Sequence, residues 1–129
     1  MSELVLADAV MDHLRRRYPC YHETAYLFIL SGLHYTLERL GEARHISGRE
    51  LTQGCRDLAI ERYGPMARSV LEFWGIRATR DLGELVFALV ECGVLVKQES
   101  DDLDDFDGVY DFAEAFERDY PWAAPVDLG

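Results

Sequence analysis

The residues best suited to chemistry lie in an acidic run near the C-terminal end of the chain, DDLDDFDGVYDFAE, residues 101–114. Aligning Gly108 with the glycine of a calcium-binding EF-hand loop places four carboxylates at ligand positions: Asp105, Asp107, Asp111 and Glu114. The first ligand position falls on Leu103, however, which has no oxygen to offer. We therefore favour a solvated acidic loop in which Asp111 caps a following helix, with a calcium site as the alternative.

A second candidate is an anion site in RHISGRE, residues 44–50. A helix that begins here offers free backbone N–H groups and the positive end of its dipole to a phosphate or carboxylate. Four side chains would surround that anion: Arg44, His45, Ser47 and Arg49. Ser47 and Glu50 also form a capping-box pattern, in which Glu50 competes for the same amides, so an ordinary capped helix start is the favoured interpretation.

Other constellations are weaker. The run Arg15–Arg17 with Tyr18 and Tyr21 combines cations and aromatic rings, as in RNA-binding segments, but basic residues in the last turn of a helix also complement its dipole. The sequence has no Cys/His zinc spacing and no GxSxG, P-loop, GxGxxG or HExxH motif. We expect neither a cofactor nor an enzyme. A small enzyme of unrecognised chemistry remains an alternative, with three candidate residues: His34, Glu38 and His45.

Helical periodicity dominates the elements that would position these residues. Apolar spacing predicts helices over 3–17, 23–40, 48–63, 65–74 and 80–92, the last capped by Thr79. Two strands, 94–98 and 109–112, are expected to flank the acidic run, followed by a short helix over 113–120 and a loosely ordered tail, 121–129. The expected fold is a mainly α, winged helix-turn-helix-like single domain, residues 1–120, with a small two-stranded antiparallel wing.

The charge distribution argues against nucleic acid as the partner of this fold. The formal net charge is −11, and residues 93–129 hold eleven acids against Lys97 and Arg118. The expected recognition helix, 80–92, exposes more acidic than basic side chains, which repel phosphates. A protein-docking surface fits better, with Arg80, Glu84, Asp104, Asp105 and Phe106 as its candidate residues, together with three further aromatic residues expected to be exposed, Tyr110, Phe112 and Phe116.

The cysteines and the N-terminal sequence indicate the compartment. Three cysteines without a CxxC pair, Cys20, Cys55 and Cys92, are expected to be reduced, buried thiols. The first residues contain no basic stretch typical of a signal peptide. Because the longest apolar runs are also too short to cross a bilayer, we expect a cytoplasmic protein without membrane contact.

Several segments resemble a family of short uncharacterised bacterial proteins that has no established activity. The similarity covers residues 20–117 and rests on four segments: RHISGREL, YGPMA, LEFWGIRATRDLGELVFALVECGVL and VYDFAEAF. The resemblance implies a bacterial origin and implies no chemistry, so it assigns no functional residues.

Together, these patterns favour a non-catalytic protein-interaction module whose partner is another protein or a second copy of the chain. The main alternative is a module that binds nucleic acid or a phosphate-bearing ligand through an arginine-bearing face, Arg15–Arg17 with Arg44–Arg49.

Overall fold

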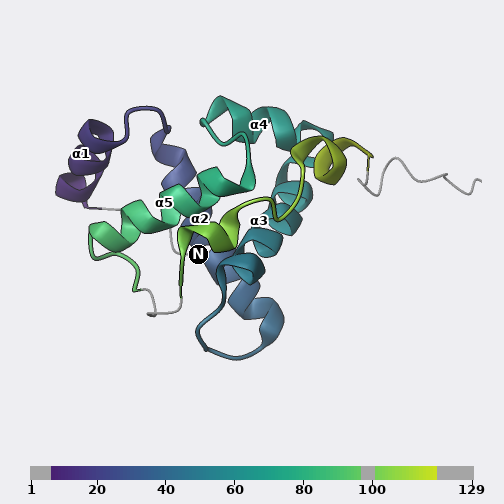
Figure 1. Ribbon diagram of the computed structural model, residues 1–129, viewed down its shortest axis with the longest axis horizontal. Coiled ribbons are helices and arrows are strands. Elements are labelled where there is room, and N and C mark those ends of the chain that lie inside the picture. Colours follow the sequence, from purple (N-terminus) through teal and green to yellow (C-terminus); the bar gives the residue numbers. More distant parts are fainter. Residues whose placement is uncertain (1–6, 97–100, 119–129) are drawn as a thin grey trace, which may run out of the picture.

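The computed structural model describes residues 7–96 and 101–118, and these residues form a mainly helical protein (Figure 1). The five α-helices are α1 (Asp8–Arg17), α2 (Glu23–Leu40), α3 (Gly48–Tyr63), α4 (Ala67–Phe73) and α5 (Thr79–Glu91). Three short elements complete the fold: η1 (Gly64–Met66) and η2 (Leu103–Phe106), which are 3-10 turns, and the π-helical turn η3 (Glu114–Arg118). The mainly α prediction is therefore confirmed.

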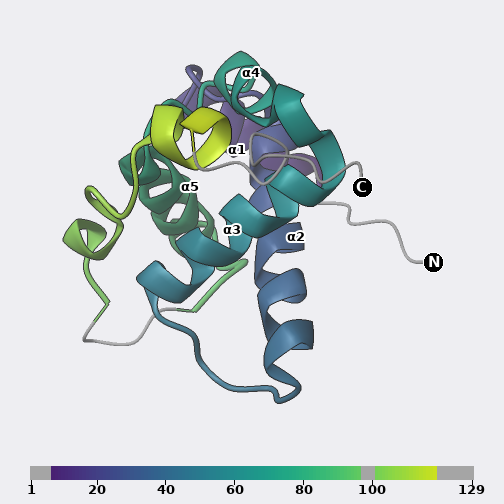
Figure 2. The same cartoon turned by 90° about the vertical axis from the view of Figure 1, so that its right-hand side faces the viewer.

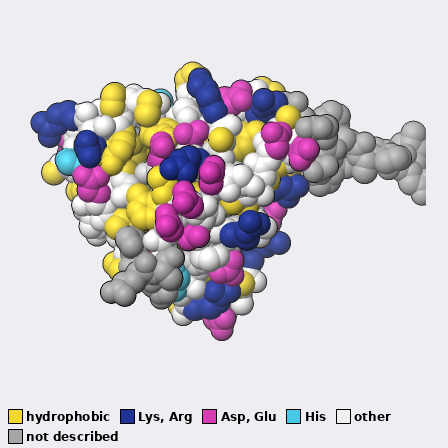
Figure 3. Space-filling model, viewed as in Figure 1, with side chains coloured by type: hydrophobic (Ala, Val, Ile, Leu, Met, Phe, Trp, Pro, Cys, Tyr) yellow, Lys and Arg dark blue, Asp and Glu magenta, His cyan; other side chains and the backbone are white. Residues whose placement is uncertain are grey.

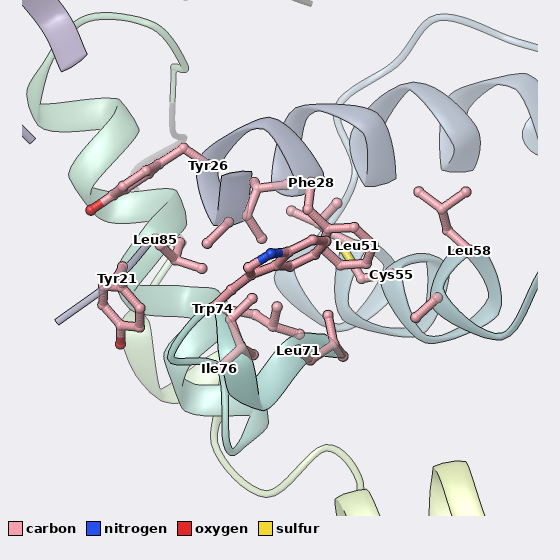
Figure 4. Packing of buried hydrophobic residues seen from close by; sticks show 14 of the residues in the cluster. Tyr21, Tyr26, Phe28, Leu51, Cys55, Leu58, Leu71, Trp74, Ile76 and Leu85 are labelled. Carbon is pink, nitrogen blue, oxygen red and sulfur yellow. The ribbon is translucent and has the colours of Figure 1, made fainter. Parts of the chain in front are cut away.

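Helix α2 is the central element, and it packs against both α3 and α5 (Figure 2). Its apolar side chains cover more than one face, which suits a helix with neighbours on two sides. Trp74, which follows α4, packs against Phe28 of α2 with ring centroids 5.7 Å apart. Figure 4 shows this indole among core side chains from several helices, including Leu51 and Leu71. Trp74 therefore lies where α2, α3 and α4 meet, within a core that also includes residues of α5.

Two glycines let α2 and α3 approach closely. A Cβ atom added at Gly54 would lie 1.8 Å from Thr36 Oγ1, and one added at Gly32 would lie 2.4 Å from Cys55 Sγ. Both distances are far below van der Waals contact, so a larger residue fits only if the facing side chain or the helix itself shifts. Thr36 is buried, and its hydroxyl donates to the carbonyl oxygen of Gly32 at 2.7 Å, which removes the cost of burying it.

The local helix signals at the start of α3 and the end of α2 are confirmed. Ser47 Oγ accepts from the Glu50 amide at 3.1 Å, and the Glu50 carboxylate accepts from the Ser47 amide at 2.9 Å. Gly41 follows α2 in the left-handed region, with φ 74°. The N-cap of α5 differs from the prediction: it is Ala78, and Thr79 is the first residue of the helix. The Asp81 carboxylate accepts from the Arg77 and Ala78 amides instead.

The two-stranded wing, and with it the winged helix-turn-helix-like fold, is wrong, because the described residues contain no strand. Residues 94–96 instead complete the C-terminal cap of α5. Gly93, with φ 77°, donates to the carbonyl oxygen of Val90, and Val94 donates to that of Leu89, the paired hydrogen bonds of a Schellman motif. Leu95 also donates to Leu89. These amides are therefore not available to a β-ladder.

The second expected strand, 109–112, is also absent, because its region is fastened to helices by side chains. Phe106 is 3% exposed and lies between Gly48 of α3 and Gly83 of α5, where an added Cβ atom would come within 2.8 Å and 2.6 Å of its ring. Val109 donates its amide to Thr79 Oγ1 at 3.2 Å, and Tyr110 donates its hydroxyl to the Thr52 carbonyl oxygen at 3.0 Å. The segment therefore occupies the groove between α3 and α5 without pairing as a strand.

The aromatic residues expected on the surface belong largely to the core. Phe106, Phe112 and Phe116 are buried, and Tyr110 is partly buried. Phe112 and Phe116 pack edge to face with ring centroids 5.1 Å apart. Burial raises the pKa of Tyr110 well above its ordinary value. These rings therefore stabilise the fold and are not available as docking residues.

Some predictions fall outside the described residues: the tail 121–129, the first residues of the helix 3–17, the end of the strand 94–98 and the end of the helix 113–120. Across the part of the chain that the structure describes, no helix is both long and apolar enough to cross a bilayer.

Candidate functional site

An apolar pocket of about 280 Å³ opens between the C-terminal halves of α2 and α5. Leu33 and Leu37 line it from α2, and Val86 and Val90 line it from α5. Val96, at its edge, is 90% exposed, an unusual position for an apolar side chain beside an apolar hollow. We call this hollow the α2–α5 pocket. Most of its surface is apolar, so it suits a hydrophobic group with polar contacts only at the rim.

The rim of the α2–α5 pocket is polar and carries charges of both signs. His45 Nε2 lies 3.2 Å from the carboxylate of Asp101, which joins the segment before α3 to the segment before η2. Arg44 Nη2 donates to Glu50 Oε2 at 2.7 Å, and Arg44 Nε lies 3.2 Å from Glu42. Asp105 also lines the pocket. The cations of the rim are thus paired with carboxylates of the same chain.

A polar recess of about 370 Å³ adjoins the α2–α5 pocket and shares Ser47, Asp101 and Asp105 with it. Its other lining residues are Arg49, Asp104 and Asp107. Figure 3 shows acidic side chains gathered near the middle of this face, where η2 lies in Figure 1, beside exposed hydrophobic surface. An apolar hollow and an acidic recess therefore lie side by side.

The predicted anion-site residues do gather at the start of α3, but their hydrogen bonds are already used within the protein. Arg44 is paired with Glu42 and Glu50, His45 is paired with Asp101, and the Ser47 hydroxyl caps the helix. Arg49 lies among the aspartates of the polar recess. The hydrogen bond from Arg44, followed by the one from the Ser47 amide, lowers the pKa of Glu50 to about 2. The carboxylate of Glu50 therefore occupies the place that an external anion would take.

Three of the four predicted calcium ligands have carboxylates that serve other contacts, and the fourth, Glu114, donates its backbone amide to one of them. Asp105 accepts from the Asp102 amide at 3.0 Å, and Asp107 lies 3.7 Å from Arg80. Asp111 accepts from the Glu114 amide at 3.2 Å, which is the predicted cap. Among the residues that the structure describes, no group of three or more His, Cys, Asp or Glu side chains is arranged to hold a metal ion.

The predicted docking residues divide into buried, internally bonded and exposed groups. Phe106 is buried, and Glu84 accepts a hydrogen bond from the Tyr21 hydroxyl at 2.6 Å. Arg80 lies 3.4 Å from Asp104, linking α5 to η2. Asp104 and Asp105 are exposed beside the polar recess. The two aspartates are therefore the most exposed of these residues, although Asp104 also faces Arg80 and Asp105 accepts from the Asp102 amide.

The outward face of α5, which reads DNA in a helix-turn-helix, is largely covered in this protein. Tyr21 donates to Glu84 and lies 2.7 Å from Asp81, and Tyr18 donates to Glu91 at 2.7 Å. Burial, followed by these hydrogen bonds, raises the pKa of Tyr21. Ala88, expected to face outward, is buried. The connection between α1 and α2 thus lies across the surface that would have to enter a groove of DNA.

The arginines of α1, whose alternative role was to bind nucleic acid, are also engaged in contacts within the protein. Arg15 bonds to Asp12 at 2.6 Å and to Glu23, and Arg17 lies 3.6 Å from Glu91. The guanidinium of Arg17 also lies over the Tyr18 ring, 5.6 Å from its centroid. These contacts hold the end of α1 against α2 and α5, as expected of a helix terminus with basic residues in its last turn.

The residues proposed for an unrecognised enzyme are not brought together in one pocket. His34 pairs with Glu38 at 3.4 Å on the exposed face of α2, whereas His45 lies at the rim of the α2–α5 pocket. Ser47 also lines that pocket, but its hydroxyl bonds to the Glu50 amide, and no hydrogen bond in the described part of the chain joins it to His45. The serine, histidine and aspartate therefore lack the contact that would activate a nucleophile.

The three cysteines do not share one environment. Cys55 is buried at the α2–α3 contact, and burial raises the pKa of its thiol to about 12. Cys92 is partly buried, but Cys20 is exposed, so the prediction of three buried thiols is wrong for Cys20. The error arises because Cys20 lies in the connection between α1 and α2, where helical periodicity gives no guide to burial.

The residues that line the α2–α5 pocket were expected to be ordinary core residues. Leu33, Leu37, Val86 and Val90 belong to the apolar stripes of their helices. The one available signal was the width of the stripe on α2, which covers more of the helix than a single neighbour can bury. Periodicity predicts which residues face other helices, but it does not show where those helices fail to meet.

Comparison of the chain with protein-family models, with curated proteins and with solved structures finds no match.

Proposed function

We propose that this chain is a non-catalytic, cytoplasmic protein-interaction module that binds its partner at the α2–α5 pocket. The observation that carries the proposal is the pocket itself, an apolar hollow of about 280 Å³ with Val96 90% exposed at its edge. Exposed apolar surface around a hollow is typical of an interaction site, because leaving it in water costs free energy.

The hollow has room for an apolar side chain of another protein. Its volume of about 280 Å³ lies at the low end of the range of about 300–1,000 Å³ that is usual for drug-sized ligands. An interface of ordinary size is anchored by a few apolar or aromatic side chains in such pockets, surrounded by a polar rim. The rim here contains Arg44, His45 and Asp101.

A protein partner also fits better than catalysis at this site. His45 is bonded to Asp101, and Ser47 to the amide of Glu50, so each has a structural partner within the chain. The lining on the α2 and α5 sides consists of aliphatic side chains and the ring of Phe87, which position an apolar group but cannot transfer a proton.

Site-specific photo-crosslinking tests the proposal. A photoreactive phenylalanine analogue placed at Val96 should crosslink to one protein in the native cell. The same analogue at Phe73, which is 77% exposed on α4, is the matched control and should not crosslink to that protein. The partner is then purified and its affinity measured by calorimetry. Val96→Ser should weaken binding about three- to tenfold, and Phe73→Ser should not change it.

The opposite pattern would overturn the proposal. A partner that crosslinks equally from both positions, or an affinity that Phe73→Ser lowers and Val96→Ser leaves unchanged, would place the interface away from the α2–α5 pocket. Crosslinking only to a small molecule would replace the protein partner by a ligand.

A further inference from the structure

We propose that the segment bound at the α2–α5 pocket is a basic amphipathic helix: an apolar side chain enters the pocket, and neighbouring Lys or Arg side chains meet the carboxylates of the polar recess. The inference rests on the proposed function and adds the chemistry of the partner. It follows from the position of the two hollows, which share Ser47, Asp101 and Asp105 along a common border. Residues one helical turn apart on a partner helix can therefore reach both.

The charges around these hollows favour a cationic partner. Acidic side chains outnumber arginines: the acids are Asp101, Asp102, Asp104, Asp105, Asp107, Glu42 and Glu50, and the arginines are Arg44, Arg49 and Arg80. Arg44 and Arg80 each face two of these carboxylates. The local potential is therefore negative, which accelerates encounter with basic segments and disfavours acidic ones.

The exposed aspartates retain capacity for a partner after their internal contacts are counted. Asp104 has 80% of its side chain exposed and Asp107 has 63%, and their distances to Arg80 are 3.4 Å and 3.7 Å. Each carboxylate has about four acceptor positions, so contact with one guanidinium leaves most of them open to Lys or Arg. The Asp102 carboxylate accepts from the Asp104 amide of η2, and the Asp105 carboxylate accepts from the Asp102 amide just before η2, which fixes the recess in place.

Two synthetic helical peptides of about 18 residues test the inference. One has leucines along one face and lysines along the other, and its matched control has glutamate in place of every lysine. Each is titrated into the ¹⁵N-labelled full-length protein, and affinity is also measured by fluorescence anisotropy. The lysine peptide should shift the amide signals of Val86, Val90 and Val96, and its affinity should fall about tenfold on raising the salt from about 0.05 to about 0.5 M. The glutamate peptide should not bind there.

Matched variants separate this site from general attraction to an acidic protein. The double change Asp104→Asn and Asp107→Asn should weaken the lysine peptide about tenfold, since two charge contacts are lost. Glu61→Gln, an exposed acid on α3 that lines neither hollow, removes charge without affecting either and should leave the affinity within about twofold. Val96→Ser should also weaken binding, because the apolar anchor is needed with the cations.

The outcomes distinguish this inference from the function on which it rests. If the glutamate peptide shifts the pocket amides as strongly as the lysine peptide, or if neither does, the basic-partner inference is overturned. The proposed function is then still tested independently, by whether the photoreactive residue at Val96 crosslinks to a protein. If the lysine peptide binds but shifts only amides elsewhere, the inference also fails.

Discussion

The two sides of α2 differ in how closely a neighbouring helix approaches. On the α3 side, Gly32 and Gly54 bring the backbones together until there is no room for a Cβ atom. On the α5 side, Leu33 and Leu37 face the valines of α5, and a hollow of about 280 Å³ remains between them. One contact is closed by small residues, and the other is held open by branched ones.

The difference shows that apolar patterning does not by itself decide whether a helix face is closely packed or borders a hollow. Both faces of α2 are apolar, and the hydrophobic effect favours burying both. Close packing, however, requires shapes that fit, and gaps between poorly matched side chains persist because interiors relax only in part. The closed contact buries its apolar surface, whereas the open one leaves apolar surface exposed at the α2–α5 pocket.

The largest expected effect is on the closed contact. Gly54→Ala places a Cβ atom 1.8 Å from Thr36 Oγ1 and forces α2 and α3 apart, so the free energy of unfolding should fall by about 3 kcal/mol. Urea denaturation followed by circular dichroism measures it. Adding Thr36→Ala should restore part of the loss, because the clashing hydroxyl is removed. A double variant no more stable than Gly54→Ala alone would show that this contact is not the cause.

An intermediate loss of stability is expected from a change at the start of α3, near the α2–α5 pocket. There the Glu50 carboxylate holds the backbone through its hydrogen bonds to Arg44 and to the Ser47 amide. Glu50→Gln keeps an acceptor for the Ser47 amide but loses the charge that faces Arg44. The variant should lose about 1 kcal/mol at pH 7, a value kept small because about a third of the Glu50 side chain is exposed.

The pH dependence of that loss follows from the pKa of Glu50, which folding lowers from 4.5 to about 2. A carboxyl group whose pKa is lower in the folded protein stabilises the fold at pH values above the pKa of the unfolded state. This contribution disappears as the pH falls from about 4.5 through about 2. Urea curves of the wild type and Glu50→Gln should therefore converge across this window, while the effect of Gly54→Ala should not change with pH. A constant gap between the two curves would contradict the assignment.

The smallest effect is expected in the open contact. Val90→Leu adds one carbon atom, as Gly54→Ala does, but it adds it beside the α2–α5 pocket. Because the space is available, the free energy of unfolding should change by less than about 0.5 kcal/mol. The same urea assay measures this. A loss of more than about 2 kcal/mol would show that the space between α2 and α5 is not available to an added group.

Sequence patterns predicted the local features of the fold. The capping box of Ser47 and Glu50, the turn at Gly41 and the helices themselves depend on residues within one or two helical turns of one another. Their hydrogen bonds form wherever the local sequence allows them. The prediction of a wing was wrong because of interactions of the same short range. The amides of Val94 and Leu95 cap α5, and a short apolar run in the sequence does not distinguish such a cap from a strand.

The order of residues alone was enough to predict that this protein is helical, where most of its helices begin and end, and that its C-terminal part is acidic. Three contacts could be found only in the folded chain: Phe106 is buried between Gly48 and Gly83, Tyr21 covers the face of α5, and His45 meets Asp101 at the rim of a pocket. The two groups of features differ in how far apart along the chain the interacting residues lie. A cap needs neighbours along the chain, whereas these contacts join residues that are distant in sequence and depend on how closely whole helices can pack.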